Sequence, residues 1–166
     1  MDRWLSVVRG LLQNLGVEAE DSDESGVVTL YVDGDLPIFL LPGDGGATLV
    51  LHAGIGSIPD ENPADVVCSL LEGNTLEMVR SGFAFGLVPG NDQVILIARA
   101  PVEGLEDDAA FALVERLVNT ASGWRDIFDS LVASAEDSVD DADSSGEDAK
   151  STERASDGRP PFEDFA

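Results

Sequence analysis

The segment Val28-Thr-Leu-Tyr-Val-Asp-Gly-Asp-Leu-Pro-Ile-Phe-Leu-Leu41 decides the class of fold. Its first half alternates side chains with a period of two, which predicts a strand with one buried face. Asp33-Gly-Asp35 carries the residue types of a tight turn, and an apolar run resumes at Leu36. The segment therefore predicts a β-hairpin.

The hairpin leads into a third strand. Pro42-Gly-Asp-Gly-Gly46 supplies a second turn, and residues 47–53 place Leu49 and Leu51 on one face. The glycine-rich turn superficially resembles a phosphate-binding loop. It joins two strands instead of opening a helix, however, and it has no Lys-Ser/Thr pair, so we interpret it as a hairpin turn. Three consecutive antiparallel strands are expected.

Helical periodicity marks three other segments. Residues 2–15 repeat apolar side chains every three or four positions, and Gly16 follows as a C-cap. Asn62-Pro63 predicts a helix start with Asn as the cap, and the apolar stripe that follows stops before Gly73, which predicts a short helix. Acidic residues 106–108 begin the last helix, where the helix dipole favours negative charge.

A second hairpin lies between the last two helices. Phe83, Phe85 and Leu87 alternate ahead of a turn at residues 89–92, and residues 94–98 form an apolar run. The predicted order is α-βββ-α-ββ-α. The fold class is therefore α+β, with a twisted antiparallel sheet.

Charge and composition exclude several function classes. The chain has 166 residues, one cysteine and a formal net charge of −24, which excludes direct binding of nucleic acid and disfavours anionic membrane surfaces. No signal peptide or membrane span of ~20 apolar residues is recognisable, so we expect a cytoplasmic protein and no membrane insertion. Residues 135–166 hold eleven acidic and three basic residues, which predicts a disordered acidic tail behind a folded domain of residues 1–134.

The sequence offers little catalytic chemistry. His52 is expected on a strand without a catalytic role, and Cys68 is expected to be a small buried hydrophobe. One Cys and one His cannot build a zinc site, and no carboxylate spacing matches a calcium loop. We therefore expect no enzyme, no metal and no cofactor. A small hydrolase or ligand-binding enzyme with an acidic site stays open as an alternative, as does acidic mimicry of nucleic acid.

Several local signatures, taken in order, resemble the class I type III secretion chaperones, the Tir chaperone (CesT-like) family. The likeness extends from about Trp4 to Leu131. It rests on these stretches: Leu11-Leu-Gln-Asn-Leu-Gly16, Val28-Thr-Leu-Tyr-Val-Asp33 with Leu36-Pro-Ile-Phe-Leu40, Gly54-Ile-Gly-Ser-Ile-Pro59, Leu70-Leu-Glu-Gly-Asn74, Gly82-Phe-Ala-Phe-Gly-Leu87 and Ala121-Ser-Gly-Trp-Arg125.

The resemblance implies a non-enzymatic homodimer that binds the N-terminal chaperone-binding segment of a secreted effector and keeps it soluble and secretion-competent. The secretion ATPase is a candidate further partner. The alternative is a sensory or regulatory protein of the same fold that is not linked to secretion. The implied effector contacts are Leu5, Val8, Leu12, Leu30, Val32, Ile38 and Leu40. The implied dimer interface consists of Val66, Val67, Leu70, Leu71, Phe83, Phe85 and Leu87.

Two further features bear on this resemblance. Trp124 and Arg125 match a family signature in the last helix, which implies a structural role, with Trp124 packed under the sheet. The acidic tail extends beyond the last helix that the family usually has. It serves either as a solubilising segment or as a regulatory one, whose Phe162 and Phe165 would dock on the protein's own groove.

Overall fold

The computed structural model describes residues 2–16 and 26–143, the last eight of them as backbone only. Three α-helices, a short 3-10 helix (Asp44–Gly46) and one sheet of five antiparallel strands make up this part, in the strand order β1-β2-β3-β5-β4. The predicted α+β class and the order of elements are confirmed. The elements are α1 (Asp2–Leu15), β1 (Val28–Val32), β2 (Leu36–Gly43), β3 (Thr48–Ser57), α2 (Pro63–Arg80), β4 (Ala84–Leu87), β5 (Gln93–Pro101) and α3 (Asp107–Asp143).

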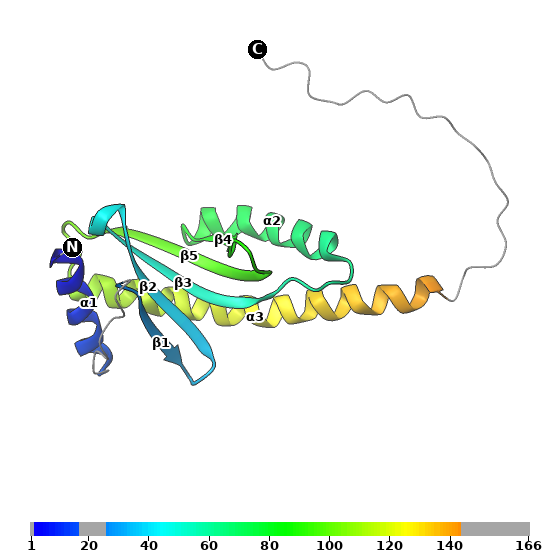
Figure 1. Ribbon diagram of the computed structural model, residues 1–166, viewed down its shortest axis with the longest axis horizontal. Helices are drawn as coiled ribbons and strands as arrows, with labels where there is room; N and C mark the ends of the chain where they lie inside the picture. The colour runs from blue at the N-terminus through cyan, green and yellow to red at the C-terminus, as the bar shows by residue number, and fades with distance from the viewer. Residues whose placement is uncertain (1, 17–25, 144–166) are drawn as a thin grey trace, which may run out of the picture.

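The three α-helices pack against different parts of the sheet (Figure 1). The long α3 runs along one face of the sheet and contacts β3 and β5, and α1 packs against α3. Helix α2 lies beside β4 at one edge of the sheet and also contacts α3. Strand β1 forms the opposite edge.

The core lies between the sheet and the helices. Alternate residues of β3 are buried, as the period of two requires, and they are Leu49, Leu51, Ala53 and Ile55. The indole of Trp4 is fully buried, and its Nε1–H donates to the carbonyl oxygen of Leu41 at 3.3 Å. This bond joins α1 to β2 and satisfies a polar atom that burial would otherwise leave unpaired.

Helix α2 is longer than the sequence predicts. The expected stop at Gly73 is wrong, because Gly73 is buried inside the helix and the helix continues to Arg80. A Cβ at Gly73 would overlap the six-membered ring of the Trp124 indole. The glycine is therefore required by the close approach of α3 and does not end the helix.

The start of α2 also differs from the sequence interpretation. Asn62 adopts a left-handed backbone with φ 47° and makes no side-chain capping bond. Its Nδ2–H instead donates to the carbonyl oxygen of Ala135 at 3.0 Å, far along α3. Helix α3 extends to Asp143, past the boundary expected at residue 134. The rest of the predicted tail, residues 144–166, lies outside the described residues.

The contact between β3 and α3 leads to a prediction about stability. Gly56 lies next to a register shift in β3, and a Cβ there would be 2.5 Å from Cε1 of the buried Phe128 ring. We expect Gly56→Ala to lower the free energy of unfolding by about 1–3 kcal/mol, since the strand or the buried Phe128 ring must shift to make room for the methyl group. Chemical denaturation measures this change.

Gly123→Ala is the matched control. Gly123 lies on α3, the helix that carries Phe128, and a Cβ there meets nothing within 4 Å. Alanine should stabilise the helix at this position by up to about 1 kcal/mol. Equal effects of the two substitutions would show that the contact between Gly56 and Phe128 is not tight.

Candidate functional site

An open groove follows the free edge of β1. It has a volume of about 430 Å³. Four consecutive strand residues, 29–32, border it, although their side chains alternate between the two faces of the sheet. The backbone edge of β1 is therefore part of the groove wall. The groove is lined by Leu15, Thr29, Leu30, Tyr31, Val32, Phe111, Val114, Glu115 and Val118.

Three elements position this groove. Leu15 comes from the end of α1, and the opposite wall consists of residues that recur on one face of α3 at steps of three and four. Asp35 lies in the β1–β2 turn, and its Oδ2 is 3.1 Å from Nη1 of Arg125, so this ion pair ties the turn to α3. The site is thus a mainly apolar wall facing a strand edge, which suits an extended peptide.

The residues implied as effector contacts fall into two groups. Val8, Leu12, Leu30, Ile38 and Leu40 are buried in the core, and Leu30 also lines the groove. Leu5 is exposed on α1, and Val32 is half-buried at the groove. Among the groove residues, the sequence interpretation did not single out Tyr31 or the α3 wall. Apolar side chains recur along α3 every three or four residues, and this pattern alone does not show whether they are buried or line an open groove.

A second surface lies over α2 and β4. Five large apolar side chains are more than half exposed there: Leu71, Leu76, Met78, Val79 and Leu87. Leu71 and Leu87 line a smaller apolar hollow of about 190 Å³ between α2 and β4. Large apolar groups exposed beside an apolar hollow indicate a contact surface.

The residues implied as dimer contacts divide in a similar way. Val66, Leu70 and Phe83 are in the core, whereas Val67 and Phe85 are half-buried and Leu71 and Leu87 are exposed. Four of the seven therefore reach the surface at the hollow. Asn74 lies between them, and its Oδ1 accepts the Phe85 N–H at 2.8 Å. This bond attaches α2 to the edge strand β4.

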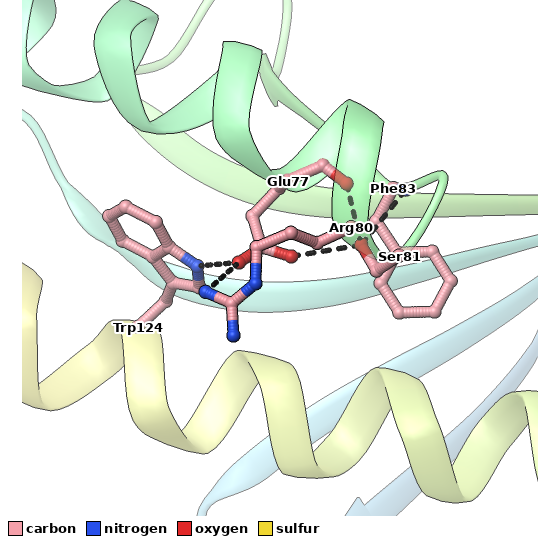
Figure 2. Close-up of polar contacts among 5 residues, drawn as sticks. All are labelled: Glu77, Arg80, Ser81, Phe83 and Trp124. Atoms are coloured by element: carbon pink, nitrogen blue, oxygen red, sulfur yellow. Dashed lines mark hydrogen bonds and ion pairs between the residues drawn. The ribbon is translucent and has the colours of Figure 1, made fainter.

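A buried carboxylate fixes α2 against α3 (Figure 2). Glu77 is 6% exposed, and among the residues that the structure describes it is the one buried charged side chain. Its Oε1 accepts the indole N–H of Trp124 at 3.1 Å, and its Oε2 accepts the Ser81 hydroxyl at 2.9 Å. Nη1 of Arg80 lies 3.9 Å from Oε1 of Glu77.

Trp124 and Arg116 complete this junction. The Trp124 ring meets Phe85 of β4 edge to face at 4.8 Å, so Trp124 packs between α2, α3 and the edge of the sheet. Arg116 donates to the Ser81 carbonyl oxygen at 2.9 Å, and its guanidinium lies 5.2 Å from the centre of the Phe83 ring. These contacts set the position of the exposed face of α2.

The remaining chemical candidates are isolated. Cys68 is exposed on α2, so the expectation of a buried thiol is wrong: hydrophobic character alone does not show which side of α2 faces the sheet. Within residues 2–16 and 26–143, no three His, Cys, Asp or Glu side chains come close enough to hold a metal ion. In the same residues, no helix combines the length and the apolar character that crossing a membrane requires.

His52 supplies a pH-dependent prediction. It is half-buried on β3, across from Phe39 and Ile97 in the neighbouring strands. Desolvation lowers the pKa of its imidazole below the ordinary value of 6.5. The folded state then binds fewer protons than the unfolded state. The stability that depends on neutral His52 is therefore present above about pH 6.5 and is lost as the pH falls through the lowered pKa.

We expect the stability difference between the wild type and His52→Gln to shift against the wild type as the pH falls from about 7.5 to 5.5. Urea denaturation of both proteins across this range measures the difference. Parallel losses of stability would show that His52 does not titrate differently in the folded state.

The chain is similar to one protein family and to several solved structures. The family model for the Tir chaperone protein (CesT) family matches residues 6–125. A search of curated protein sequences finds no significant match.

Several solved structures share the fold. The HopA1–SchA chaperone–effector complex contains a chain that is 17% identical, with a TM-score of 0.63 and coverage of 75% of this chain and 94% of that one. A chain of the ExsC–ExsE complex is 22% identical, with a TM-score of 0.64 and coverage of 77% of this chain and 97% of that one. A chain of the ExoT–SpcS complex from Pseudomonas aeruginosa is 19% identical, with a TM-score of 0.57 and coverage of 73% of this chain and 96% of that one.

Proposed function

The chain belongs to the Tir chaperone protein (CesT) family, and from this membership we propose that it is a type III secretion chaperone. It binds the N-terminal chaperone-binding segment of a secreted effector and keeps that segment soluble and secretion-competent. It acts in the cytoplasm, before the effector is exported. Neither an enzymatic step nor a cofactor is part of this function.

The groove along β1 is the observation that carries the proposal. A strand edge provides main-chain donors and acceptors, while the wall of α3 provides apolar contacts for alternate side chains of an added strand. Together they hold a segment extended and cover its apolar side chains. No catalytic residue is needed, because the whole action is binding.

Recovery of a bound client tests this function. The tagged protein is purified under mild conditions from its own host while the secretion system is expressed, and co-purifying proteins are identified by mass spectrometry. We expect a secreted protein in stoichiometric amount, bound through its N-terminal region. Removing that region from the client should abolish recovery. Isolation of the chain alone would contradict the proposal.

The surface over α2 and β4 supports a homodimer as part of the same proposal. Its exposed apolar side chains would be covered by the same surface of a second copy, as in a twofold interface. The effector groove lies at the other edge of the sheet, so both contacts are compatible in one assembly.

A further inference from the structure

Glu115 is the charged side chain in the groove along β1. It is exposed on α3 and stands between apolar wall residues, one turn from Phe111 and close to Val118 along the helix. Among the described residues, no ion pair or hydrogen bond engages its carboxylate. The groove therefore offers one negative charge without a partner.

The arginines of α3 are engaged elsewhere. Arg116 follows Glu115 in sequence, but it donates to the Ser81 carbonyl oxygen and stacks on Phe83, on the side of the helix that faces α2. Arg125 pairs with Asp35 at 3.1 Å. Neither of them is paired with Glu115, so its carboxylate is available to a basic side chain of a bound partner.

This arrangement discriminates between possible occupants. A wholly apolar segment that covered the groove would remove water from Glu115 and leave an uncompensated charge, which is unfavourable. A segment with a basic side chain at the same point would form a partly desolvated ion pair and keep the apolar contacts on either side. The rejection of apolar segments adds to selectivity as much as the attraction of basic ones does.

We propose that Glu115 is a specificity-determining residue. It selects client segments that are extended, that alternate apolar side chains, and that place one Lys or Arg on the side facing α3. This inference rests on the proposed chaperone function and adds the chemistry of the segment to it. Alternation is required because successive side chains of an added strand point to opposite faces.

Two labelled synthetic peptides test the inference. They share one alternating Leu and Val sequence and differ at a single central position on the groove-facing side, which is Lys in one and Met in the other. Fluorescence anisotropy measures their binding to the full chain. We expect the wild type to bind the Lys peptide about tenfold more tightly, at the low end of the effects of close charge pairs at interfaces because Glu115 is exposed. The preference should weaken as salt rises.

Variants of the protein distinguish the effect of the charge at position 115 from the effect of the net charge of the chain. Glu115→Gln should remove the preference, and Glu115→Lys should reverse it. Glu103→Lys makes the same change in net charge at an exposed position outside the groove, and it should keep the preference. Circular dichroism confirms the fold of each variant.

Three outcomes of the peptide experiment would overturn the inference. These are a lack of preference in the wild type, a preference that survives in Glu115→Gln, and a failure of both peptides to bind. The chaperone function itself is judged separately by client recovery. If the wild type and Glu115→Lys recover the same client equally, the function stands and the role of Glu115 is refuted.

Discussion

Replacing Glu77 by alanine is expected to lower the free energy of unfolding by about 3 kcal/mol. The carboxylate is almost fully buried and accepts hydrogen bonds from the Trp124 indole and the Ser81 hydroxyl. Alanine removes both acceptors at once and leaves a cavity between α2 and α3. The indole N–H would then be buried without a partner. Urea denaturation followed by circular dichroism measures the loss.

Glu77→Gln is the matched variant. Its side-chain oxygen can still accept the Trp124 N–H, and its volume is nearly unchanged, so we expect a loss of only about 1 kcal/mol. A double-mutant cycle with Trp124→Phe isolates the bond between the two side chains, because Phe removes the donor and keeps a ring in place. Equal destabilisation by Ala and Gln would mean that charge, and not the hydrogen-bonded geometry, holds the two helices together.

The strands were predictable from the sequence because burial follows a period of two. The register of β3 places Leu49 and Leu51 on the core side, as alternation requires. Helix boundaries were less predictable where a distant residue decides them. Glycine is a residue type that often ends a helix, but Gly73 lies inside α2. The reason is the close approach of the Trp124 ring, 51 positions along the chain. Similarly, Asn62 bonds to Ala135 and not to its own helix.

The candidate site was less accessible from sequence than the fold. Apolar periodicity marks which residues avoid water, but it does not show which of them remain open after packing. Val8 and Leu12 therefore have the same pattern as Leu5, although only Leu5 is exposed. One signal was available for the second surface. Helix α2 has apolar residues on more than one side, including Leu71 and Leu76, which a helix with a single buried face does not need.

This exposed apolar face of α2 leads to the second large effect: Leu71→Glu is expected to convert a dimer into a monomer. Leu71 is 61% exposed and borders the hollow between α2 and β4. In a twofold interface each substitution occurs twice, so one change places two carboxylates in a surface that excludes water. Their desolvation opposes association, whereas the fold of each protomer is unaffected because Leu71 is not a core residue.

Light scattering at micromolar concentration distinguishes the two states. The wild type should have twice the chain mass of 17.5 kDa, and Leu71→Glu should have the single mass. Tyr31→Glu is the reciprocal control: Tyr31 is 68% exposed on the groove at the opposite edge of the sheet. It should leave the dimer intact and reduce client recovery. A monomeric wild type would refute the homodimer. A dimer that persists in Leu71→Glu would place the interface away from α2, and loss of the dimer in Tyr31→Glu would move it to the β1 edge.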